Sequence, residues 1–121
     1  MRYTYQLPVS FTLDQVIQFG ELTGDSGPVH SNDGIVQGGL ILSMLPKWLN
    51  QIIAENNLGT GLERSVSIIL DAKFRNKLES NKPVQVSFGY DVAGKTISKL
   101  EWKVFDNEKE YCFGKWIIHK S

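Results

Sequence analysis

The chain has 121 residues, which is enough for one folded domain with a hydrophobic core and too few for two. Hydrophobic residues make up 41% and charged residues 21%, which is typical of a globular protein and too apolar for a disordered one. Thirteen basic residues balance thirteen acidic ones, which argues against a nucleic-acid partner, because such binders usually carry a basic excess. The single cysteine, Cys112, excludes an internal disulfide framework and a multi-cysteine zinc site.

The N-terminal residues 1–11 lack a basic start followed by a continuous apolar stretch, so we expect no signal peptide. No apolar run approaches membrane-spanning length, because the segment 38–53 is interrupted by Lys47, Asn50 and Gln51. These features predict a cytoplasmic protein that does not contact a membrane.

The first half of the chain predicts a strand and two helices. Residues 2–11 are rich in aromatic and β-branched types and contain Pro8, as edge strands do. Thr12 and Gln15 fit a capping box before a short helix over residues 13–22, and Gly24 is expected to end it. Residues 24–37 predict a loop. A long apolar helix follows from Gly38, with a kink expected at Pro46.

The helix after Gly38 is apolar on most sides in its first half, so we expect it to be covered on most sides. Residues after 62 predict four strands: 65–74, buried on both faces at its centre; 84–92; 96–105; and 111–119. Turns are expected at 93–95 and 106–109. Separate helices and antiparallel strands predict an α+β protein over residues 1–121, with a curved sheet wrapped around one central helix, which is the hotdog fold. The uncovered sheet edge and helix surface favour a homodimer or higher homo-oligomer.

The loop over residues 24–37 holds the strongest candidates for chemistry. Asp25 and His30 lie on either side of a Gly27-Pro28 turn. A carboxylate and an imidazole at this spacing are able to exchange protons with a water molecule. A plain structural interpretation remains open, in which Asp25 caps a turn and His30 is a solvated loop residue.

Gly38 is the candidate donor for a carbonyl oxygen. The first N–H groups of a helix lack intrahelical partners and lie at its positive end, and glycine lets a ligand approach closely. The alternative is that Gly38 and Gly39 only allow tight packing at the start of the helix.

Several of these segments resemble the MaoC-like hydratases and dehydratases, which include the (R)-specific enoyl-CoA hydratases. The residues from Phe19 to His30 resemble the family signature LTGD-x-N-P-x-H. The run from Ile35 to Leu40 is similar to the family segment I-V-H-G-M-L at the start of the central helix. Residues 72–76 and 82–84 are similar to the F-x-x-P-V stretch after the third strand.

The resemblance implies a lyase of fatty acid metabolism that interconverts an α,β-unsaturated acyl thioester and its (R)-3-hydroxyacyl form, carried on CoA or acyl carrier protein. It assigns water activation to Asp25 and His30, and the thioester carbonyl to the N–H of Gly38. It implies no cofactor and no metal.

Two positions and the length of one segment differ from the family pattern. Gly27 stands where the family has asparagine, Gln37 stands where it has histidine, and the segment from Ser31 to Gln37 is shorter than usual. Two other functions therefore remain open: a hotdog acyl-thioester thioesterase, and a non-catalytic acyl-binding or partner subunit.

Overall fold

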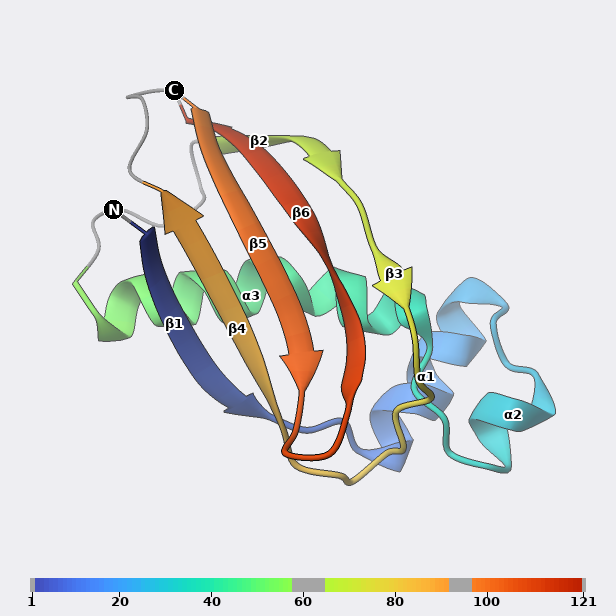
Figure 1. Cartoon of the computed structure of the whole chain (residues 1–121). Coiled ribbons are helices and arrows are strands. Elements are labelled where there is room, and N and C mark those ends of the chain that lie inside the picture. Colours follow the sequence, from blue (N-terminus) through green and yellow to red (C-terminus); the bar gives the residue numbers. More distant parts are fainter. Residues whose placement is uncertain (1, 58–64, 92–96, 121) are drawn as a thin grey trace.

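A curved antiparallel sheet lies across one long helix in the computed structural model of the chain (Figure 1). The structure describes residues 2–57, 65–91 and 97–120. The elements in chain order are β1 (Arg2–Val9), α1 (Leu13–Thr23), α2 (Pro28–Ser31), α3 (Gly38–Glu55), β2 (Ser65–Leu70), β3 (Lys73–Phe74), β4 (Val84–Asp91), β5 (Ile97–Phe105) and β6 (Glu110–Lys120). The prediction of an α+β arrangement with one central helix is confirmed. The turn expected at 93–95 lies outside the described residues.

The strand order across the sheet is β1-β4-β5-β6-β2, and β3 also pairs with β6. Every pairing is antiparallel. The strand β1 lies at one edge, as predicted, and its Pro8 pairs in register with Gln85. An edge strand tolerates proline because one side of the strand needs no N–H donors.

The strand expected over residues 65–74 is interrupted, and the prediction that its centre is buried on both faces is wrong. It divides into β2 and β3 at the sheet edge, and Ile69, Leu70 and Phe74 are 50%, 40% and 50% exposed. An edge strand has a neighbour on one side only. Apolar side chains there are therefore left partly uncovered in the single chain.

Close contact between Asp71 and β6 accounts for this interruption. The Asp71 N–H donates to the Lys115 carbonyl at 2.9 Å, and the Asp71 Oδ1 accepts from the Lys115 N–H at 2.6 Å. A Cβ on Gly114 would lie 2.0 Å from the Asp71 carbonyl oxygen. Glycine at position 114 is therefore required for the chain to approach this closely.

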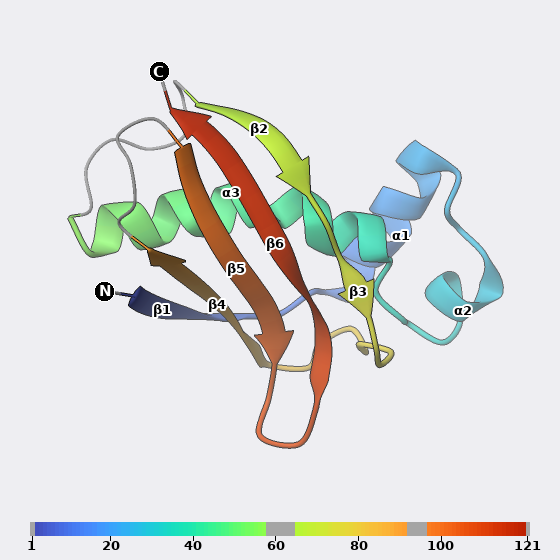
Figure 2. The ribbon, with the colours of Figure 1, turned by 45° about the horizontal axis from the view of Figure 1, so that its top comes forward.

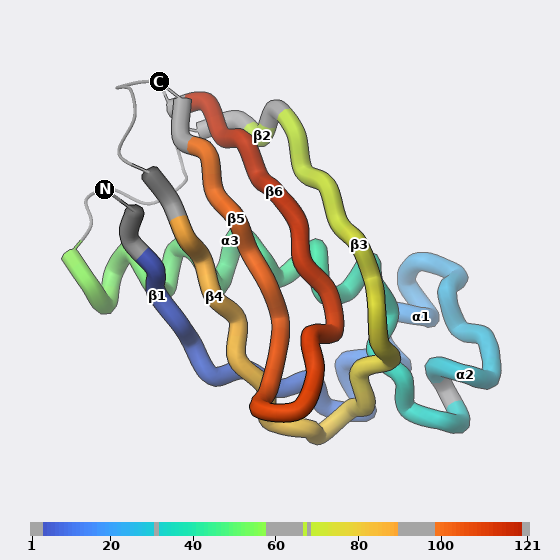
Figure 3. Tube along the Cα trace, viewed as in Figure 1, coloured from blue at the N-terminus to red at the C-terminus, as the bar shows by residue number. Residues whose placement is uncertain are grey.

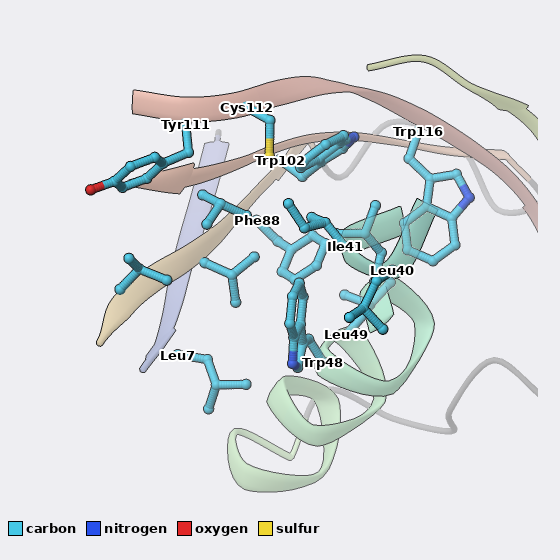
Figure 4. Packing of buried hydrophobic residues seen from close by; sticks show 14 of the residues in the cluster. Leu7, Leu40, Ile41, Trp48, Leu49, Phe88, Trp102, Tyr111, Cys112 and Trp116 are labelled. Atoms are coloured by element: carbon cyan, nitrogen blue, oxygen red, sulfur yellow. The ribbon is translucent and has the colours of Figure 1, made fainter. Parts of the chain in front are cut away.

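The core fills the space between α3 and the concave face of the sheet (Figure 4). Trp48, Trp102 and Trp116 are all buried there. Cys112 is fully buried on β6, and burial raises the pKa of its thiol to about 12. It fills space as an uncharged apolar side chain.

Only one side of α3 is covered by the sheet. Leu42 and Met44 are half-buried, and Ser43, Pro46 and Lys47 are exposed. The expectation that the first half of this helix is covered on most sides is therefore not met in a single chain. Pro46, which has no N–H to donate to the Leu42 carbonyl, lies on this exposed side of the helix.

The helix α1 begins and ends as its sequence predicts. The Thr12 hydroxyl accepts from the Gln15 N–H at 3.1 Å, and the Gln15 side chain accepts from the Thr12 N–H at 2.8 Å, which completes the capping box. Gly24 ends the helix with a φ of +80°. Both α1 and α2 lie beside the N-terminal end of α3 and close to β3 (Figures 2 and 3). Within the described residues, no helix combines the length and apolar character needed to cross a membrane.

Candidate functional site

The segment between α1 and α3 contains a helical turn where the sequence predicts only loop. The prediction of a continuous loop over residues 24–37 is wrong at Pro28–Ser31, which form the single helical turn α2. Pro28 occupies its first position, where a missing N–H costs nothing, and the His30 N–H donates to the Gly27 carbonyl at 2.9 Å. This turn fixes the backbone of His30 relative to Asp25.

Asp25 and His30 are in contact. The Nε2 of His30 lies 3.3 Å from the Oδ1 of Asp25. The imidazole is 18% exposed and the carboxylate 52% exposed, so the pair lies at the surface with the acid facing solvent. The structure therefore brings together the acid and the histidine that the sequence singled out.

The hydrogen bond made by the other ring nitrogen of His30 determines which nitrogen of the neutral ring carries the hydrogen. Its Nδ1 lies 2.6 Å from the Ile35 carbonyl oxygen. Because a carbonyl oxygen only accepts, Nδ1 carries a hydrogen and donates it. In the neutral ring Nε2 then has a free lone pair, and in the imidazolium form it donates toward Asp25. The contact between Nε2 and the carboxylate is thus a position for one transferable proton.

The carbonyl that orients His30 is held by its own neighbours. The Ile35 N–H donates to the Val29 carbonyl at 3.1 Å, and the Val36 N–H donates to the Leu78 carbonyl at 2.8 Å. Ile35 also forms an isolated β-bridge with Glu79. The short segment before α3 is therefore anchored both to α2 and to the chain before β4.

Gly38 is the first residue of α3. A Cβ at this position would lie 2.8 Å from the Phe74 ring, so the aromatic ring packs directly over the start of the helix. Gly38 lines a cavity of about 320 Å³ together with Phe74, Arg75, Lys77 and Tyr111, among others. His30 lines a different, smaller cavity of about 130 Å³ against α1. Gly38 is close to Asp25 and His30 in the sequence, but it lines a different cavity from His30.

Gln37 is the residue at this site that sequence reasoning missed. It stands between Val36 and Gly38 and is fully buried. Its Nε2 donates to the Val16 carbonyl at 2.8 Å and to the Asp25 carbonyl at 3.1 Å. A lone polar residue inside the apolar run that enters the helix was the available signal, since buried amides usually have a bonding role.

Three other polar residues, His119, Ser43 and Asp71, lie away from this site. His119 is exposed on β6. Ser43 is exposed and donates to the Leu40 carbonyl at 2.7 Å, which is a bond within its own helix. Asp71 is exposed, and its carboxylate accepts from the Lys115 N–H. In the part of the chain that the structure describes, no three His, Cys, Asp or Glu residues group as a metal site would require.

Solved structures resemble this chain over nearly its whole length. The (R)-hydratase of A. caviae involved in PHA biosynthesis matches with a TM-score of 0.77 and 16% identity, over 98% of this chain and 95% of the other. A protein of Archaeoglobus fulgidus, af1124, matches with a TM-score of 0.77 and 18% identity, over 98% and 77%. A mutant of the fluoroacetyl-CoA-specific thioesterase FlK matches with a TM-score of 0.68 and 12% identity, over 98% and 90%.

The fold is a hotdog fold. The predicted fold class is confirmed, and the resemblance to (R)-hydratases seen in the sequence extends to three dimensions. No protein-family model matches the sequence, and a search of curated proteins finds no match. At 10–18% identity the structural neighbours include both hydratases and thioesterases, so what they have in common with this chain is the fold.

Proposed function

We propose that this protein is a hydratase or dehydratase that interconverts an α,β-unsaturated acyl thioester and its (R)-3-hydroxyacyl form. The observation that carries the proposal is the 3.3 Å contact between Asp25 and the His30 Nε2, with the opposite nitrogen committed to the Ile35 carbonyl. Reversible hydration needs a group that takes a proton from water and a group that supplies one to the α-carbon. An acid and an imidazole in contact meet that requirement.

In the hydration direction the carboxylate of Asp25 takes a proton from the attacking water, whose oxygen bonds to the β-carbon. The His30 Nε2–H supplies a proton to the α-carbon. Asp25 then holds the proton taken from water, and the direct contact lets this proton pass to Nε2, where it replaces the one that His30 gave to the α-carbon. The pair is restored with one water added, so atoms and charge balance, and dehydration is the same path reversed.

The thioester carbonyl is assigned to the N–H of Gly38. Negative charge grows on this oxygen as water adds, and a fixed donor at a helix N-terminus stabilises it. Gln37 caps α3 without a side-chain hydrogen bond to the helix, so its side chain does not compete for the first N–H groups. Arg75 and Lys77 on the rim of the Gly38 cavity are suited to the phosphates of CoA or of the acyl carrier arm.

A homodimer completes the proposal. Ile69, Leu70 and Phe74 form an exposed apolar edge next to the Gly38 cavity, and half of α3 is left uncovered. A second copy on this edge would bury these side chains and would add a wall to the cavity.

Incubation of the purified protein with crotonyl-CoA tests the reaction. We expect loss of the enoyl absorbance, no release of free thiol, and a 3-hydroxybutyryl-CoA product of R configuration. Free thiol without a hydroxyacyl product would favour a thioesterase, a class to which a structural neighbour also belongs. Neither product with any chain length would favour a non-catalytic acyl-binding subunit.

A further inference from the structure

We infer that Gln37 is a positioning residue for the Asp25–His30 pair, and that its side-chain oxygen holds a water molecule in the cavity beside His30. The part of this inference that concerns catalysis rests on the proposed function. The part that concerns geometry does not.

The first argument is the pair of hydrogen bonds that Gln37 donates. We call these two bonds, from Nε2 to the carbonyls of Val16 and Asp25, the Gln37 bridge. They join α1, the loop residue that carries the candidate acid, and the start of α3. Both amide hydrogens are used, and both partners are main-chain atoms whose places are set by the fold. The bridge therefore fixes the main chain of Asp25 rather than its carboxylate.

The second argument is the close contact between the loop at Asp25 and Gly20 of α1. A Cβ on Gly20 would lie 2.9 Å from the Asp25 carbonyl oxygen and 3.1 Å from the Cα of Ser26. The glycine in α1 thus lets the loop lie directly on the helix. The Asp25 carbonyl is held between Gly20 on one side and the Gln37 amide on the other.

The third argument concerns the remaining polar atom of the amide. The Gln37 Oε1 is buried, and no donor among the described residues lies within hydrogen-bond distance. A buried amide oxygen without a donor costs free energy, so native structures pair such atoms with protein or water. Gln37 lines the cavity of about 130 Å³ that His30 also lines. A water molecule, which occupies about 30 Å³ in the liquid, fits this cavity, and a small shift of the Gln37 side chain would bring the buried Oε1 into contact with it.

The cavity also offers the further partners that an internal water needs. Ser26 and Glu21 line it in addition to Gln37 and His30. A water that donates to Oε1 has a second hydrogen and two lone pairs for these polar neighbours. Such a water would connect the Gln37 bridge to the imidazole that exchanges protons with Asp25.

The decisive experiment does not depend on activity. Gln37→Met keeps the length of the side chain and removes both donors and the acceptor. We expect the ¹⁵N signal of the His30 Nε2, which faces the Asp25 carboxylate, to shift in the variant, because the main chain of Asp25 loses its bond from the Gln37 amide. The carboxyl groups that face the ring, Asp25 in contact and Glu21 across the cavity, are unchanged in the variant. Identical His30 signals in a folded Gln37→Met protein would overturn the inference.

Two control variants separate positioning from general loss of stability. Gln51→Met makes the same chemical change on the exposed side of α3, where Gln51 bonds only within its helix turn to Glu55. Leu45→Ala destabilises the fully buried core of the same helix. We expect wild-type His30 signals in both. A His30 change in Leu45→Ala as large as in Gln37→Met would show that the effect is one of stability and would contradict the inference.

A second variant separates the bridge from the water. Gln37→Glu keeps the acceptor oxygen but places a second oxygen against the Val16 and Asp25 carbonyls. We expect disturbed His30 signals at neutral pH, with partial recovery at acidic pH, where a protonated carboxyl again donates one bond. A crystal structure of the wild type should show a water within hydrogen-bond distance of Oε1. A protein donor in its place would remove the water from the inference.

Kinetics test the link to catalysis. With crotonyl-CoA, we expect Gln37→Met to lower kcat by on the order of 10- to 100-fold with KM near the wild-type value, because misplaced catalytic groups slow the chemical step. Unchanged kcat together with altered His30 signals would remove the catalytic role. An inactive wild type would refute the proposed function, and the His30 measurements would still decide the geometry.

Discussion

Asp25 and Asp106 are both carboxylates in connecting segments, and the protein treats them differently. Asp106, in the turn between β5 and β6, accepts from the N–H groups of Glu108 and Lys109 at 2.8 and 2.9 Å and from the Tyr111 hydroxyl at 2.5 Å. Lys82 adds an ion pair at 3.4 Å, and the side chain is 17% exposed.

The Asp25 carboxylate contacts His30 at 3.3 Å and is 52% exposed. Its main-chain carbonyl receives the fixed bond, from Gln37. The comparison separates two uses of one functional group. A carboxylate whose lone pairs are all engaged holds the fold together, whereas one that faces solvent on a fixed backbone remains available to water and substrate.

The most damaging change for activity is expected at Asp25. Asp25→Asn preserves the shape of the side chain but removes the base, so we expect kcat for crotonyl-CoA hydration to fall about 10²- to 10⁴-fold. The melting temperature should stay close to that of the wild type because the side chain is half exposed. Thermal unfolding and the enoyl absorbance assay measure the two effects. Retained activity would show that Asp25 is not the base.

The largest change in stability is expected at the sheet edge. Gly114→Ala would place a Cβ 2.0 Å from the Asp71 carbonyl, and β2 would have to move away from β6. We expect unfolding in urea to require about 1–3 kcal/mol less free energy. Gly27→Ala is the matched control, because a Cβ there meets nothing within 4 Å. Equal stability of the two variants would contradict the tight contact.

Asp106→Asn sharpens the comparison through pH. Hydrogen bonds from Tyr111, then from the N–H groups of Glu108 and Lys109, hold the pKa of Asp106 well below its ordinary value of 3.8. A lowered pKa stabilises the folded state fully above the unfolded value, and this stabilisation is lost as the pH falls through the folded pKa.

We therefore expect wild type to lose stability on acidification below about pH 4. Asp106→Asn should be less stable than wild type at neutral pH, and its free energy of unfolding should fall less steeply as the pH is lowered. Hydration activity should be unchanged. Chemical denaturation of both proteins between pH 2 and pH 7 measures this dependence. Parallel curves for the two proteins would show that the lowered pKa contributes nothing to folding.

The smallest effect is expected at the start of α1, the helix on which Asp25 rests. Thr12→Ala removes one side of the capping box and should lower the free energy of unfolding by about 1 kcal/mol. Thr12→Ser retains the hydroxyl and should restore most of it. Activity should change little in either variant, since Gly20 and Gln37 still hold the loop.

Local signals predicted the parts of the fold that depend on neighbouring residues. The capping box at Thr12 and the end of α1 at Gly24 both depend on residues a few positions apart, and both are confirmed. The break between β2 and β3 was not predicted, because it depends on Asp71 meeting Gly114, which is 43 residues later in the chain. Contacts of that kind leave no periodic pattern in the sequence.

The candidate site divides in the same way. The Asp25–His30 contact follows from a spacing of five residues and was predicted. The orienting bond from His30 to the Ile35 carbonyl and the Gln37 bridge involve main-chain atoms, whose identity no residue letter records. The expected grouping of Gly38 with the pair stays a prediction. In this chain Gly38 opens onto its own cavity.

The burial of Cys112 has a practical consequence. The one thiol of the chain stays protonated at neutral pH and faces the core, between its register partners Phe74 and Val104 on the neighbouring strands. A thiol reagent therefore reacts only when the helix and the sheet separate. The rate of labelling at Cys112 therefore measures how often the core opens. A cysteine introduced at an exposed position accepts a spectroscopic probe without prior removal of the native one.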